Sequence, residues 1–259
     1  MLLRALVLSL ALLAAAPVRA AEEVDLALVI AVDVSNSMDP EEQELQRDGF
    51  VEAFRSAEVH GAIARGALGR IAVVYMDWAG TGTQGVVVPW TIIDGPEAAA
   101  AFAARLESAP NRRAPRTSIS GALDFSMRLL GQSGVEAIRQ VIDVSGDGAN
   151  NQGRPVLQAR EAALARGVTI NGLPIMLKRP TGSWDVAHLD AYYRDCVIGG
   201  AGAFMIPIRE RRDFATAVRT KLVREIADLG PEASFTRVQA EARVDCMAGE
   251  RAADDWWRN

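Results

Sequence analysis

The feature that most constrains the fold is a nearly continuous apolar run followed directly by a polar turn and a helix start. Residues 24–32 are apolar except for Asp25, a pattern typical of a buried parallel strand. Residues 33–37 read DVSNS, and Asp39 and Pro40 then predict a helix with Asp39 as its N-cap. This order predicts oxygen-bearing side chains at the C-terminal end of a central strand, where open α/β sheets bind ligands.

The spacing within DVSNS is compatible with a metal site. Asp33, Ser35 and Ser37 stand at alternate positions, so that a curled turn brings one carboxylate and two hydroxyls to a common point. Mg2+ accepts such oxygen ligands in near-octahedral geometry, at about 2.0–2.1 Å. The alternative is an ordinary strand-to-helix turn in which Ser and Asn bond the backbone. The pentapeptide alone leaves both interpretations open.

Helical and strand patterns alternate through the rest of the chain, which predicts an α/β fold with a mostly parallel sheet covered on both faces. Pro89, and a short Gly/Thr loop before its strand, predict an antiparallel edge strand. The expected strands are residues 24–32, 70–76, 84–93, 139–144, 168–175 and 203–207. The expected helices are residues 41–56, 58–67, 96–106, 117–130, 155–166, 184–196 and 210–228.

Two further oxygen donors fall at the same predicted edge of the sheet. Thr117 stands at the start of a predicted helix, and Asp147 follows the strand at residues 139–144. Together with the DVSNS side chains they favour a metal site over a plain turn. The predicted ligands are Asp33, Ser35, Ser37, Thr117 and Asp147.

This pattern of D-x-S-x-S, a later Thr and a final Asp resembles the metal-ion-dependent adhesion site (MIDAS) of von Willebrand factor type A (vWA) domains. The resemblance covers about residues 24–228 and extends to an exported bacterial subgroup of that family. It implies a Rossmann-like vWA fold with one antiparallel edge strand. The sequence departs from the family pattern in having Gly146 between Ser145 and Asp147, and Arg116 instead of Gly before Thr117.

The resemblance also implies a function. In the family the two Ser and the Thr touch the ion, and the carboxylates often act through water. The expected activity is non-enzymatic binding, through Mg2+ (with Mn2+ or Ca2+ as alternatives), of a protein partner that supplies an Asp or Glu side chain. A metal-assisted hydrolase using the same site is the alternative function, although no G-x-S-x-G elbow occurs.

The N-terminus predicts export. Residues 1–20 carry Arg4, a short apolar run and the sequence Val-Arg-Ala before Ala21, which is typical of a signal peptide cleaved after Ala20. Residues 21–230 then form the vWA domain and residues 231–259 a tail, in a periplasmic or secreted protein without stable membrane insertion. Loss of Arg4 and Arg19 lowers the net charge of −5 by two, to −7, which argues against a nucleic-acid partner.

The two cysteines predict a link between tail and domain. In an oxidising compartment Cys196 and Cys246 favour a disulfide, worth roughly 4 kcal/mol in the chain-entropy model. Two buried free thiols are the alternative.

Other residues near the predicted site have two interpretations each. The three arginines at positions 112, 113 and 116 either steer an acidic partner or belong to a solvated loop. Trp78 is either an exposed contact residue or a core residue. The two asparagines at positions 150 and 151 either shape the Asp147 loop or serve only as turn residues. These residues are Arg112, Arg113, Arg116, Trp78, Asn150 and Asn151.

Overall fold

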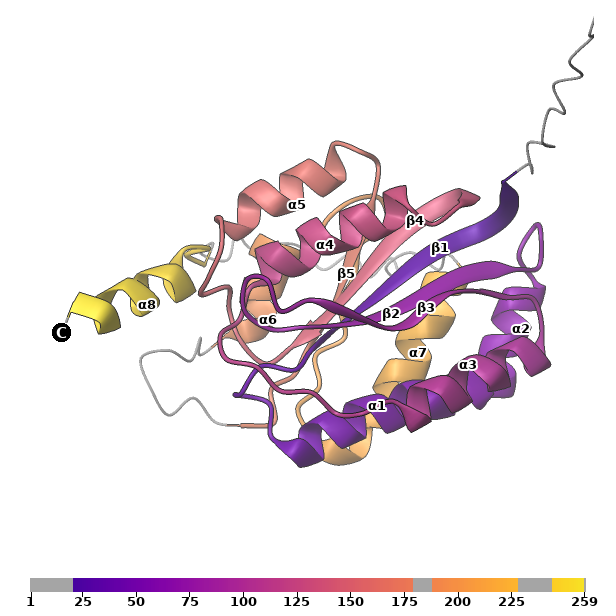
Figure 1. Ribbon diagram of the computed structural model, residues 1–259, viewed down its shortest axis with the longest axis horizontal. Coiled ribbons are helices and arrows are strands. Elements are labelled where there is room, and N and C mark those ends of the chain that lie inside the picture. Colours follow the sequence, from indigo (N-terminus) through magenta and orange to yellow (C-terminus); the bar gives the residue numbers. More distant parts are fainter. Residues whose placement is uncertain (1–20, 179–187, 228–243, 259) are drawn as a thin grey trace, which may run out of the picture.

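The computed structural model describes residues 21–178, 188–227 and 244–258, with side chains up to Ala253. A five-stranded sheet with the order β3-β2-β1-β4-β5 forms its centre (Figure 1). Four of the strands, β2, β1, β4 and β5, run parallel, and β3 pairs antiparallel with β2 at one edge, which confirms the predicted mixed sheet. The strands are β1 (Glu22–Asp33), β2 (Ile71–Trp78), β3 (Gly85–Ile93), β4 (Val135–Gly146) and β5 (Thr169–Pro174).

Helices cover both faces of the sheet (Figure 1). Residues of β1 alternate between two cores: Leu28 packs toward one layer of helices and Val29 toward the other. The first layer consists of α1 (Pro40–Arg55), α2 (Ala57–Ala64), α3 (Pro96–Ser108) and α7 (Phe214–Ile226), preceded by a 3-10 turn (Arg211–Asp213). The second consists of α4 (Ile119–Gly131), α5 (Val156–Leu164), α6 (Leu189–Tyr192) and a π-helical turn (Tyr193–Val197), with α8 (Ala248–Arg258) beyond them.

The start of α1 is fixed by a reciprocal capping box. The Asp39 carboxylate accepts a hydrogen bond from the Glu42 backbone N–H at 2.8 Å, and the Glu42 carboxylate accepts one from the Asp39 N–H at 2.8 Å. Pro40 is the first helical residue, where its missing N–H costs nothing. The predicted cap is confirmed, and it fixes where the DVSNS turn ends.

Several segments differ from the predicted boundaries; β4, for example, spans Val135–Gly146 where residues 139–144 were expected. β2 continues through Asp77 and Trp78, beyond its predicted end at residue 76, because Trp78 pairs with Asp33 and its ring is buried. Residues 203–207 were expected to form a strand but make only isolated bridges to β5 and its end, since Pro174 has no N–H to continue the ladder. The predicted helix at residues 184–196 is described only from residue 188.

A buried ionic cluster joins β4, β5 and α7. The Lys221 ammonium lies 2.5 Å from an oxygen of Asp143 and also contacts Glu225, which accepts a 3.0 Å bond from Asn171. Burial, and then the neighbouring Asp143 carboxylate, raise the pKa of Glu225 to about 7. The cluster ties the last helix of the domain to the sheet.

The N-terminal segment and the apolar character of the helices both bear on the predicted export. The expected signal peptide at residues 1–20 lies outside the described residues. Within the described residues, no helix combines the length and apolar character needed to cross a membrane.

Candidate metal site

Three loops meet where the parallel strands end. Asp33 closes β1, and Asp147 follows β4, the parallel neighbour of β1, so both carboxylates belong to the same edge of the sheet. Thr117 precedes α4, whose N-cap is Ser118. The Ser118 N–H donates to the Ala79 carbonyl at 2.8 Å, which brings the Thr117 loop to the end of β2.

A chain of hydrogen bonds joins four of the five predicted ligands. The Ser35 N–H donates to Asp33 Oδ1 at 2.7 Å, and the Ser35 and Ser37 hydroxyls lie 2.8 Å apart. The Ser37 hydroxyl donates to Asp147 Oδ1 at 2.6 Å, across 110 positions of sequence. The DVSNS turn therefore curls as its spacing predicts.

Thr117 is held beside this group by Asn151. The Asn151 side-chain oxygen accepts from the Thr117 N–H at 2.9 Å, and the Asn151 N–H donates to the Thr117 carbonyl at 2.8 Å. A Cβ at Gly148 would lie 3.7 Å from Thr117 Oγ1, so this hydroxyl is close to the Asp147 loop. Asn151 thus sets the distance between two loops of the site, the first of the two roles considered for it.

Arg116 stands where vWA domains carry Gly, and its backbone has that conformation. Its φ is 73°, the left-handed region that favours glycine. Among the described residues no other non-glycine has a positive φ. Such strain, on the order of 1 kcal/mol, is typical of functional sites. The substitution preserves the turn that places Thr117.

The electrostatics of the two carboxylates are unfavourable without a cation. Asp33 is fully buried, and its Oδ2 atom has no hydrogen-bond partner among the residues that the structure describes. Burial, and then the Asp147 carboxylate, raise the pKa of Asp33 well above its ordinary value. Burial raises the pKa of Asp147 to about 6. A divalent ion beside these groups would supply the missing partner and compensate both charges.

The donor set and the available space fit a hard divalent ion. Carboxylate and hydroxyl oxygens are the ligands that Mg2+ accepts. A Cβ at position 146 would lie 2.8 Å from Asp33 Oδ2 and 3.1 Å from the Tyr193 hydroxyl. Gly146, which replaces the Ser or Thr of the family pattern, therefore leaves room around the unpartnered oxygen.

Lys178 is a residue of this site that the sequence interpretation missed. Its ammonium group contacts the Ser37 carbonyl and the buried Glu42 carboxylate, and it lies 4.0 Å from Asp147 Oδ2. Lys178 follows β5, so its position after a parallel strand was the signal available in the sequence. At the rim of the site it therefore compensates the buried Glu42 carboxylate.

Two of the nearby arginines are tied to the protein. Arg113 donates to the Asn36 and Met38 carbonyls at 2.8 and 3.2 Å and so braces the DVSNS turn. Arg112 pairs at 3.0 Å with the buried Asp77. Trp78 is a core residue, so its interpretation as a contact residue is wrong.

This fold is that of a von Willebrand factor type A domain, and solved structures of that class are similar to it. One is proximal thread matrix protein 1 from the mussel byssus with a zinc-occupied MIDAS motif (TM-score 0.56, 17% identity, 80% of this chain and 48% of that chain). A second is a von Willebrand factor type A protein from Catenulispora acidiphila (TM-score 0.53, 16% identity, 78% of this chain and 43% of that chain). A third is the vWF domain of the type V pili tip protein Mfa5 from Porphyromonas gingivalis (TM-score 0.53, 10% identity, 83% of this chain and 99% of that chain). The present chain spans less than half of the mussel and Catenulispora chains.

A family match defines the chain more closely. Residues 23–230 match the family described as "Protein of unknown function (DUF1194)", and the chain belongs to this family. No curated protein matches it.

Proposed function

We propose that this protein is an exported vWA module that binds a protein partner through a divalent ion, with an Asp or Glu side chain of the partner completing the site. The observation that carries the proposal is the buried, unpartnered Oδ2 of Asp33 beside the Asp147 carboxylate, within a hydrogen-bonded group of oxygen donors. The proposed ion is Mg2+, with Mn2+ or Ca2+ as alternatives.

The residues of the site have distinct roles in this proposal. Hydroxyls would contact the ion directly, whereas the two carboxylates would compensate its charge, in part through water. The ion would supply a Lewis-acidic position for an anionic oxygen. The hydroxyls are those of Ser35, Ser37 and Thr117, and the carboxylates those of Asp33 and Asp147.

The surroundings of the site favour an acidic ligand. At the rim, the Lys178 ammonium pairs with the Glu42 carboxylate and lies 4.0 Å from Asp147 Oδ2, so it offsets negative charge that an acidic side chain of the partner would otherwise meet. Around it, Arg113 holds the DVSNS turn in place, which lowers the conformational cost of binding. The proposed function is therefore binding by a preorganised site, without catalysis.

Export and domain limits belong to the same proposal. The proposed organisation is a leader at residues 1–20, a vWA domain at residues 21–230 and a tail at residues 231–259. The disulfide between Cys196 and Cys246 supports it, because it links the tail to the domain and because such bonds persist in oxidising compartments. The similar structures include a thread matrix protein and a pilus tip protein.

The test is selection of a random peptide library on the mature protein in Mg2+, followed by elution with EDTA. The proposal predicts that eluted peptides are enriched in Asp and Glu, and that Thr117→Val, which keeps the side-chain shape and removes the oxygen, abolishes the enrichment. Equal recovery on the wild type and on Thr117→Val would contradict it.

A further inference from the structure

The C-terminal helix α8 packs against the loop that carries Asp147. It lies at the end of the sheet where β1 and β4 terminate (Figure 1). A Cβ at Gly249 would lie 2.2 Å from the Asn150 carbonyl oxygen, so α8 approaches this backbone as closely as only glycine permits. The contact is three residues away from a proposed metal ligand.

Asn150 connects α8 to the rest of the site. Its side-chain NH2 donates to Glu250 Oε1 at 2.8 Å, and its side-chain oxygen accepts from the Ser120 N–H at 2.9 Å. Its own N–H donates to the Tyr192 hydroxyl at 3.2 Å. Asn150 is completely buried, so each of these bonds fixes the loop. The adjacent Asn151 then positions Thr117, as described above.

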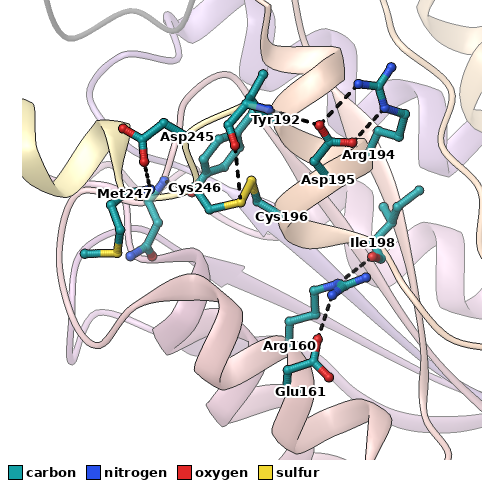
Figure 2. Close-up of a disulfide and its surroundings, with 12 residues drawn as sticks. Arg160, Glu161, Tyr192, Arg194, Asp195, Cys196, Ile198, Asp245, Cys246 and Met247 are labelled. Carbon is teal, nitrogen blue, oxygen red and sulfur yellow. Dashed lines mark hydrogen bonds and ion pairs between the residues drawn. A yellow bond between two sulfur atoms is a disulfide. The ribbon is translucent and has the colours of Figure 1, made fainter. Parts of the chain in front are cut away.

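The disulfide holds α8 in this place. Cys196, in the π-helical turn, is bonded to Cys246, two residues before α8 begins, which confirms the predicted pairing (Figure 2). The Val244 N–H donates to the Asp195 carboxylate at 3.2 Å on the same segment. A cavity of about 720 Å3 is lined by this segment on one side and by α5 on the other.

We propose that α8 and its disulfide support the metal loop, and that the protein therefore binds its divalent ion more tightly with the disulfide formed than with it reduced. The inference rests on the proposed function, whose regulation it describes. Reduction by a dithiol transfers two electrons and two protons to the bond. Cys196 and Cys246 become thiols, and the dithiol becomes a disulfide. Cys196 is fully buried, whereas Cys246 lines the cavity beside α5, so Cys246 is the side from which a reductant reaches the bond.

The size of the effect follows from the position of Asn150. Residues that orient metal ligands without touching the metal typically contribute about 10- to 100-fold to metal affinity. We therefore expect reduction to weaken Mg2+ binding by about tenfold or more. Because linkage is reciprocal, saturating Mg2+ must shift the dithiol–disulfide equilibrium toward the disulfide by the same factor. Each tenfold shift changes the reduction potential of the disulfide by about 30 mV.

The experiment is calorimetric titration of Mg2+ into the mature wild-type protein and into the double variant Cys196→Ser/Cys246→Ser, with circular dichroism to confirm folding. Two further variants, in which the disulfide stays formed, test whether α8 supports the loop independently of the loss of the covalent bond. Gly249→Ala pushes α8 from the Asn150 carbonyl, with Gly131→Ala as its control, since a Cβ there meets only an Arg166 side-chain nitrogen at 4.0 Å.

Glu250→Ala removes the bond to Asn150, and its control Glu250→Gln keeps the accepting oxygen and removes the charge. The proposal predicts weaker Mg2+ binding in the double variant, Gly249→Ala and Glu250→Ala, and near wild-type binding in both controls.

Binding by the wild type with equal affinity in all variants would overturn the inference and leave the proposed function intact. Absence of binding by the oxidised wild type would instead overturn the proposed function. Should the double variant be unfolded, the two oxidised variants decide. The potential of the disulfide with and without Mg2+ provides a separate readout, and a potential that Mg2+ does not change would also contradict the coupling.

Discussion

Replacing Asp33 by Asn should stabilise the metal-free protein while removing its affinity for metal. Asp33 Oδ1 accepts the Ser35 N–H, and an Asn side-chain oxygen keeps that bond. Within the described parts of the chain Oδ2 has no partner, and it is exposed to the charge of Asp147, so the substitution removes a buried negative charge there. A site that is unfavourable when empty and favourable when loaded is the expected signature of a metal centre.

The magnitude follows from the cost of a buried unsatisfied group, which is about 1–3 kcal/mol and larger for a charge. The amide that replaces Oδ2 also needs a partner, so we expect a net gain of about 1–2 kcal/mol. For a domain of this size, that raises Tm by about 2–8 °C. In Mg2+ at 100 times its Kd, the wild type gains about 2.7 kcal/mol and the variant nothing, so their order reverses.

The assay is thermal unfolding in EDTA and in Mg2+, with Asp25→Asn as the matched control. Asp25 lies on the same strand and is also buried, but its oxygens accept from the Leu68 and Arg70 N–H groups. Asp25→Asn should therefore lower Tm in both conditions. A lower Tm for Asp33→Asn than for the wild type in EDTA would refute the electrostatic reasoning.

Further predictions concern the buried ionic cluster around Glu225 and the shape of the metal site. In EDTA, the unfolding free energy of the wild type relative to Glu225→Gln should fall by about 1–3 kcal/mol from pH 4.5 to 8. The reason is that the pKa of Glu225 in the folded protein, about 7, exceeds its ordinary value of 4.5, so that folding favours the protonated carboxyl group. Urea titrations at several pH values measure this change, and a constant difference between the two proteins would contradict it. Gly146→Ala should weaken Mg2+ binding in calorimetry, since its Cβ would lie 2.8 Å from Asp33 Oδ2, and unchanged binding would show that this space is not used. Arg113→Ala should weaken Mg2+ binding by about 10-fold through loss of two bonds to the DVSNS turn, whereas Arg112→Ala, which leaves those bonds intact, should change it less.

The parts of the fold that the sequence predicted are those encoded by local patterns. The apolar run of β1, the Asp39 cap and the antiparallel edge strand at Pro89 each follow from neighbouring residues. Hydrogen bonds join four of the five proposed ligands, and Thr117 lies close to the Asp147 loop, because each of the five follows or precedes an element whose type was predictable. The disulfide was predictable because the chain has two cysteines.

The parts that were missed depend on contacts between distant segments. Lys178 reaches Glu42 across 136 positions, and Asn150 reaches Glu250 across 100, and no periodicity signals either contact. Trp78 was ambiguous because an aromatic residue at a strand end suits either a surface or a core. The interrupted ladder at Pro174 required knowledge of which segment lies beside β5.

The measurement that tests the metal site most directly is calorimetric titration of Mg2+ and Mn2+ into chelator-stripped mature protein, beside Asp33→Ala and Thr117→Ala. The proposed site predicts saturable binding of one ion per chain to the wild type, no binding to Asp33→Ala and weaker binding to Thr117→Ala. Binding of equal strength to all three proteins, or none to the wild type, would contradict it.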